Sequence, residues 1–124
     1  MKEFKTKLGT LLPMLDLKGK DYLQVQYRLV WFREEHPNYS ISTNIIESKD
    51  GFIVKAVIAD DKGFTLAEAH KWSGSNKYPL ECAETGAIGR ALAFIGYGTS
   101  FCADELDEGQ ELADPPVGNH LLTL

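Results

Sequence analysis

Residues 39–72 have the pattern of three β-strands joined by two short turns. The three segments, 39–48, 52–59 and 64–72, are rich in β-branched residues or alternate between two kinds of side chain. The turns between them, 49–51 and 60–63, both end in glycine, which is typical of hairpin turns. Turns this short join neighbouring strands that run in opposite directions. The segment therefore predicts a three-stranded antiparallel meander.

A helical pattern flanks the predicted sheet on each side. The first helix is expected to begin at Asp21, a suitable N-cap, and to end near Glu35, because His36 precedes a proline and is disfavoured in helical geometry. The second helix is expected to run from residue 79 or 80 to about Ile95, where Gly96 stops it. The residues expected on the exposed side of the first helix are Gln24, Arg28, Trp31 and Glu35.

The resulting order is α-β-β-β-α, which predicts one α+β domain whose three-stranded antiparallel meander is covered by the second helix. A single helix layer covers only one face of such a sheet. The other face and the two edges then need a ligand or a partner chain, so we expect a homo-oligomer.

The chain of 124 residues is long enough for one ordinary domain. We expect an N-terminal arm over residues 1–19, a core domain over 20–102 and an acidic flexible tail over 103–124. No apolar run approaches the roughly 20 residues of a membrane helix, and the N-terminus lacks the apolar segment of a signal peptide. Together with a content of only 2 cysteines, these features predict a cytoplasmic protein without membrane partners.

The net charge of −5 is unevenly distributed. Residues 1–100 contain all 13 basic residues and 12 of the 18 acidic ones, a net charge of +1. The remaining 24 residues contain 6 acids and no base. An acidic chain is a poor partner for nucleic acid, but this division leaves the body of the protein nearly neutral, with room for a basic face.

Basic and aromatic residues gather after the third predicted strand. Lys71, Trp72, Lys77 and Tyr78 combine cations for phosphates with flat side chains for stacking, and Arg90 is the matching cation on the second helix. A polar strand edge with a tryptophan in a subunit contact is the structural alternative. The glycines inside that helix, at 86 and 89, indicate close approach of another backbone, from the sheet, a subunit or a phosphate chain.

Little in the sequence supports catalysis, so we expect no enzyme, no cofactor and no metal. The phosphate-cradling pattern of ATP-binding loops is absent, and the three histidines lack metal-ligand spacing. Cys82 lies within the predicted helix, where a small packed residue is the simpler interpretation.

The run AETGAIGRALAFIGYG at residues 83–98 resembles the signature helix of the Rad fifty-two-like single-strand annealing family, especially its short phage and prophage members. The resemblance covers residues 20–102. It implies a ring or filament that binds single-stranded DNA and anneals it without ATP in homologous recombination or DNA repair. An exonuclease or host replication and recombination proteins would be its partners, in the bacterial cytoplasm.

The same resemblance implies a DNA-binding set. Arg90 matches the cation that contacts the phosphate backbone, and Lys71 approximately matches a basic residue at the exit of the third strand. Two further basic positions of the family correspond to Gly89 and Ala93 here. The expected contribution of Lys71, Lys77, Lys55 or the N-terminal lysines to the positive groove then rises. The expected DNA-binding residues are Arg90, Lys71, Trp72, Lys77, Tyr78 and Lys55.

Two alternatives to an annealing protein stay open. A double-stranded RNA-binding domain is also α-β-β-β-α, but it needs lysines at the start of its second helix, where this chain has Glu81 and Glu84. The second alternative is an oligomeric interaction domain without nucleic acid. Binding of labelled single-stranded DNA compared with duplex RNA separates these possibilities.

Overall fold

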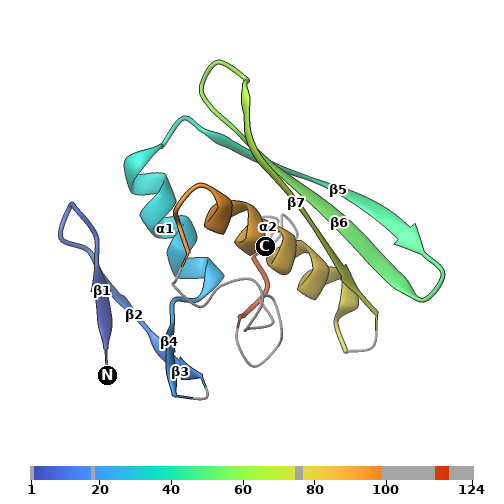
Figure 1. Ribbon diagram of the computed structural model, residues 1–124, viewed down its shortest axis with the longest axis horizontal. Coiled ribbons are helices and arrows are strands. Elements are labelled where there is room, and N and C mark those ends of the chain that lie inside the picture. Colours follow the sequence, from blue (N-terminus) through green and yellow to red (C-terminus); the bar gives the residue numbers. More distant parts are fainter. Residues whose placement is uncertain (1, 18, 75–76, 99–113, 118–124) are drawn as a thin grey trace, which may run out of the picture.

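The computed structural model describes residues 2–17, 19–74, 77–98 and 114–117 (Figure 1). Within these ranges the chain forms two helices and seven strands in an α+β arrangement. The elements, in order, are β1 (Glu3–Lys5), β2 (Leu11–Pro13), β3 (Leu15–Leu17), β4 (Lys20–Tyr22), α1 (Val25–Glu35), β5 (Ser40–Ser48), β6 (Gly51–Ala59), β7 (Thr65–Ser73) and α2 (Pro79–Phe94). No helix in these ranges is long and apolar enough to cross a membrane.

The predicted meander is confirmed. Strands β5, β6 and β7 form a three-stranded antiparallel sheet in sequence order. β5 and β6 stay in register from the pair Ser48–Gly51 to the pair Ser40–Ala59. β6 and β7 pair from Phe52–Ser73 onward, with one register shift between Ile58 and Ala59.

Helix α2 lies across the face formed by β6 and β7, and α1 packs beside α2 (Figure 1). The sheet contributes Val54, Ala56 and Ile58 from β6, with Ala67 and Ala69 from β7, and all five are buried. The residues of α2 that complete this core include Ala83, Ala87, Ala91 and Leu92. Alanines on both sides let the helix approach the sheet closely, so the small-residue run of α2 is a packing feature.

The segment expected to be an N-terminal arm contains regular structure. Within residues 2–17 and 19–22 the chain forms two antiparallel hairpins, β1–β2 and β3–β4, beside α1 (Figure 1). The ring of Phe4 on β1 lies 4.4 Å from that of Trp31 on α1, which fixes the first hairpin against the helix. Strands of three residues are too short to show an alternating pattern in the sequence.

The predicted start of α1 is also wrong, although its end at Glu35 is confirmed. Asp21 lies in β4, and the helix begins at Val25 with Gln24 in the N-cap position and no side-chain cap from it. The cap comes from a distant residue: the Val25 backbone N–H donates to Oδ1 of Asp114 at 2.6 Å. A carboxylate at this position also interacts favourably with the positive end of the helix dipole.

Arg28 was expected on the exposed side of α1, and this prediction is wrong because its side chain is fully buried. Its Nε donates to the carbonyl of Leu23 at 3.0 Å, and Nη1 donates to the carbonyl of Gly89 on α2 at 3.1 Å. Its Nη2 donates to the Tyr22 hydroxyl at 3.2 Å. The guanidinium therefore joins β4, α1 and α2.

Four residues of the expected flexible tail, 114–117, are described, and two of them form hydrogen bonds to the body. Asp114 is buried, and its Oδ2 accepts a hydrogen bond of 2.5 Å from Tyr22, the same hydroxyl that accepts from Arg28. The Val117 N–H donates to the Thr85 hydroxyl on α2 at 3.2 Å. Asp114 and Val117 are therefore held against the body, whereas Pro116 is exposed; the remaining residues of the tail lie outside the described ranges.

We expect Asp114→Ala to lower the free energy of unfolding by about 1–3 kcal/mol, the cost of leaving buried hydrogen-bond donors unsatisfied. Asp114→Asn keeps one acceptor oxygen, so its loss should be smaller. Urea unfolding followed by circular dichroism measures both, with Asp61→Ala in the exposed β6–β7 turn as the control. An alanine variant as stable as the parent protein would show that the Asp114 contacts contribute nothing.

Candidate nucleic-acid interface

The face of the sheet that points away from α2 is not covered by any described element (Figure 1). The register aligns Ile46, Ile53 and Trp72 in one row across β5, β6 and β7, and the next row contains Asn44, Lys55 and His70. Nζ of Lys55 lies 3.3 Å from a carboxylate oxygen of Glu68 on β7. Two of the predicted site residues, Lys55 and Trp72, therefore share this open face.

One end of the sheet brings the β5–β6 turn against the end of β7. We call it the turn end: residues 48–51, 72–74 and 77–78. An added Cβ on Gly51 would lie 2.2 Å from the Ser73 carbonyl oxygen, and one on Gly74 would lie 2.3 Å from the Asp50 carbonyl oxygen. The two backbones therefore touch, and only glycine fits at both positions.

Trp72 is held at the turn end by its own contacts. Its indole Nε1 donates to the Ser48 hydroxyl at 3.1 Å, and its ring lies against Gly74. About half of the side chain stays exposed, 49%. A flat apolar surface is thus presented to solvent in a fixed position.

The start of α2 completes the turn end. Tyr78 occupies the N-cap position, and the Lys77 ammonium lies 5.5 Å from the centre of its ring, in a cation–π contact. Both side chains are exposed, as is Lys49 in the β5–β6 turn. The acids Glu47, Asp50 and Glu81 lie on the same elements, so the turn end offers separate cations rather than a strongly positive patch.

The other two predicted residues lie elsewhere. Lys71 is buried on the side of β7 that faces α2, in the same alternating row as Ala67 and Ala69. Arg90 is half-buried, and its Nη1 donates to the backbone carbonyl of His70 on β7 at 2.9 Å. Lys77 and Tyr78 thus lie together at the start of α2, Lys55 and Trp72 lie on the open face, Lys71 faces α2, and Arg90 reaches from α2 to the backbone of β7.

A second group of exposed cations lies on the N-terminal hairpin and on α1, and it includes N-terminal lysines that the sequence also offered as cations for DNA. Lys5 and Lys7 flank the tip of β1–β2, and the Thr6 hydroxyl between them donates to Glu34 on α1 at 2.7 Å. Arg33, exposed on α1, donates to the Tyr39 carbonyl. The first helix thus has cations near its C-terminal end.

Two groups near the end of α1 have shifted pKa values. A hydrogen bond from the Tyr97 hydroxyl, 2.8 Å from Oε1, lowers the pKa of the Glu35 carboxyl, and the Trp31 indole N–H bonded to the other oxygen adds to this. Burial, and next the bond to Glu35, raises the pKa of Tyr97 to about 12. The contact thus favours the ionised form of Glu35 and the protonated form of Tyr97.

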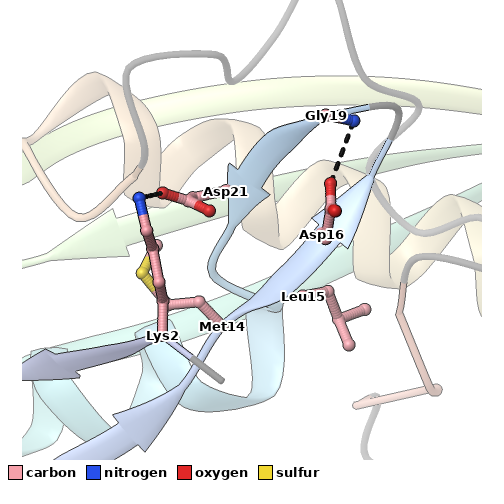
Figure 2. A pocket seen from close by; sticks show the side chains of 6 residues that line it. All are labelled: Lys2, Met14, Leu15, Asp16, Gly19 and Asp21. Atoms are coloured by element: carbon pink, nitrogen blue, oxygen red, sulfur yellow. Dashed lines mark hydrogen bonds and ion pairs between the residues drawn. The ribbon is translucent and has the colours of Figure 1, made fainter.

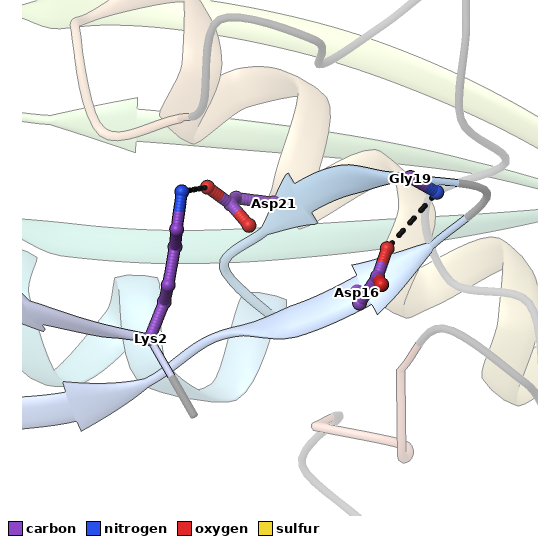
Figure 3. Close-up of polar contacts among 4 residues, drawn as sticks. All are labelled: Lys2, Asp16, Gly19 and Asp21. Atoms are coloured by element: carbon purple, nitrogen blue, oxygen red, sulfur yellow. Dashed lines mark hydrogen bonds and ion pairs between the residues drawn. The ribbon is translucent and has the colours of Figure 1, made fainter.

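A pocket of about 600 Å³ lies between the N-terminal strands (Figure 2). Its lining residues are Lys2, Met14, Leu15, Asp16, Gly19 and Asp21. Lys2 Nζ lies 2.9 Å from Oδ2 of Asp21, a contact that raises the pKa of Lys2, and Asp16 Oδ1 accepts from the Gly19 N–H at 2.9 Å (Figure 3). Two carboxylates disfavour a phosphate here, so this pocket is not part of the candidate interface.

Across the described ranges, no group of three or more His, Cys, Asp or Glu side chains could hold a metal ion.

A family model described as Slr1353 N-terminal dsRNA-binding domain-like matches residues 29–95. This segment extends from within α1 through the three-stranded sheet to the residue after α2. No curated protein and no solved structure matches the chain.

This match overturns the resemblance to the Rad fifty-two-like annealing family. The run that suggested it has a structural explanation: Ala83, Ala87 and Ala91 are buried in the core, and the Gly89 carbonyl accepts from Arg28. Small residues at these positions are required wherever a helix packs closely on a sheet. The phosphate contacts expected of Arg90 and Lys71 stay predictions.

Proposed function

The chain belongs to the Slr1353 N-terminal dsRNA-binding domain-like family, and on this premise we propose that it is a nucleic-acid-binding domain whose ligand is double-stranded RNA. The observation that carries the proposal is the family match itself, because it covers the unit from within α1 through β5, β6 and β7 to the end of α2. Single-strand annealing, the function expected from the sequence, has no such support.

The recognition of duplex RNA depends mainly on shape and on contacts to phosphates and 2′-hydroxyls. To recognise duplex RNA in this way, a protein needs a rigid surface with cations at separate positions. It does not need pockets for individual bases. The close packing of α2 on the sheet and the buried Arg28 contacts supply such rigidity. Lys49 and Lys77 at the turn end and Arg33 on α1 are exposed cations on different elements.

The start of α2 has no cluster of lysines, which limits the electrostatic contribution to the affinity for duplex RNA. Glu81 lies in the first turn of that helix, and Lys77 precedes it. We therefore propose that Lys49 and Lys77 contact phosphates individually. This makes the affinity modest and less dependent on salt than that of a strongly basic domain.

The proposal is tested by fluorescence anisotropy with four labelled ligands of one sequence: duplex RNA, duplex DNA, single-stranded RNA and single-stranded DNA. The duplex should span about 16 base pairs, the length that such domains cover. We expect the lowest Kd for duplex RNA. Equal or tighter binding of either single strand would contradict the proposal.

A double variant, Lys49→Ala/Lys77→Ala, is expected to weaken binding of duplex RNA and to make log Kd less sensitive to log salt. Each lost phosphate contact reduces the slope by about 0.9, the value for duplex DNA. Lys62→Ala is the matched control, because Lys62 is an exposed cation in the β6–β7 turn at the opposite end of β6. An unchanged slope in the double variant, or an equal change in the control, would exclude the turn end as the phosphate-binding surface.

A further inference from the structure

The two edges of the three-stranded sheet differ in how they are protected. At the β7 edge, Arg90 reaches from α2 and donates to the His70 carbonyl at 2.9 Å. This carbonyl already has a hydrogen-bond donor, which hinders the addition of another strand there. Strand β5 forms the other edge and, within the described ranges, pairs with β6 alone.

β5 lacks the usual features that keep an edge strand from pairing. It has nine residues, SISTNIIES, with no lysine, arginine, proline or glycine and with one charge, Glu47. Its register with β6 is continuous over all nine pairs, so β5 has no bulge that would twist the edge and hinder pairing with another strand. Edge strands of this length are normally interrupted by such features, because unpaired backbone groups otherwise join another strand.

Two large apolar side chains on β5 are left half-exposed, one on each face of the sheet. Ile45 is 50% exposed and Ile46 is 49% exposed. A strand added to this edge would bury part of Ile45 on one face of the sheet and part of Ile46 on the other. The edge therefore offers backbone hydrogen bonds and apolar contacts together.

We propose that β5 pairs with β5 of a second copy of this chain, antiparallel about a two-fold axis at Asn44, to form a continuous six-stranded sheet. The sequence of β5 complements itself in this arrangement. Thr43 faces Ile45 and Ser42 faces Ile46 of the second copy, and the two Asn44 side chains, which can both donate and accept, face each other. Glu47 faces Ile41, so no like charges meet.

The charge pattern selects this orientation. Parallel pairing in register would place the two Glu47 carboxylates side by side, which is unfavourable. A two-fold contact is also closed, so it gives a dimer rather than an open filament. The proposal concerns assembly and does not depend on the proposed RNA ligand.

Light scattering on the full chain at micromolar concentration tests the dimer. We expect the parent protein to have the mass of two chains. Ser42→Lys/Ile46→Lys should give a monomer, because the new ammonium groups face each other across the axis. Ser42→Glu/Ile46→Lys should restore the dimer, because the carboxylate at position 42 then faces the ammonium at position 46 of the second copy. Leu66→Lys, at an exposed position of β7, is the control for surface charge.

A cysteine on the axis tests the register. Asn44→Cys should form a disulfide-linked dimer under mild oxidation, because directly opposite residues of antiparallel strands lie about 4.5–5.5 Å apart. Ser42→Cys should not, because its two copies would be about 14 Å apart along the strands, beyond the roughly 7 Å limit of a disulfide. The parent chain, treated in the same way, shows how much cross-linking arises from its native cysteines. A monomeric parent protein, a dimer that survives the double lysine variant, or equal cross-linking at both positions would overturn the proposal.

Discussion

The Arg28→Ala variant is expected to lose about 3–5 kcal/mol of the free energy of unfolding, the usual cost of removing one partner from a buried charged network. The guanidinium is fully buried and donates to two backbone carbonyls, Leu23 and Gly89, and to the Tyr22 hydroxyl. Its removal leaves these acceptors without their donor and opens a cavity between α1 and α2. For a small domain this loss is a large part of the total stability.

Urea unfolding followed by tryptophan fluorescence and by circular dichroism measures the loss. Arg33→Ala is the control, because Arg33 lies on the same helix but is exposed, and we expect a change within about 0.5 kcal/mol. Arg28→Lys separates charge from geometry, since one ammonium group cannot reproduce the fork of the guanidinium. An alanine variant with the stability of the control would show that the buried contacts of Arg28 are not required.

The second large effect is expected at Gly51, the first residue of β6. In Gly51→Ala the new methyl group would lie 2.2 Å from the Ser73 carbonyl oxygen and 2.6 Å from the Gly74 Cα. Both are backbone atoms, so the strands must move apart, and we expect a loss of about 3 kcal/mol, the upper end of the range for overpacking. Thermal unfolding by calorimetry measures this change.

Gly63→Asn is the matched control for Gly51→Ala. Gly63 also lies in a turn of the sheet, but no atom lies within 4 Å of its missing Cβ, and its φ of +86° suits asparagine. We expect this variant to lose at most about 1 kcal/mol, the lower end of the cost of the left-handed conformation for an L-residue, because asparagine tolerates this conformation better than most residues. If both variants lost the same amount, the close contact at Gly51 would not be the cause.

The sheet could be predicted from the sequence because its signals are local. β-branched residues and two glycine-containing turns located the strands to within one residue, as with β7, predicted at 64–72 and found at Thr65–Ser73. The end of α1 at Glu35 follows from the proline two residues later. Its start could not be predicted, because the capping carboxylate of Asp114 is 89 residues away in the sequence.

The candidate site was less predictable because side-chain orientation depends on tertiary packing. The buried position of Lys71 has a signal in the sequence: it alternates with Ala67 and Ala69, and small residues mark the face that meets the glycine- and alanine-rich helix. Arg28 has no such signal, since one of its acceptors is a backbone carbonyl in the other helix. Trp72, Lys77 and Tyr78 are close in the sequence and lie where β7 passes into α2, so their position near one end of the sheet could be expected; their contact with nucleic acid stays a prediction.

The capping of α1 by Asp114 has a consequence for how the chain reaches its native state. Hydrogen bonds from Tyr22 and Val25 to this carboxylate join residues separated by 92 and 89 positions. Contacts of such long sequence separation form late, because the entropy of closing the loop must be overcome first. During synthesis on a ribosome, the first turn of α1 is made early, yet it stays without its cap until residue 114 has left the exit tunnel. The sheet and α2 can then assemble ahead of the helix that precedes them in the chain.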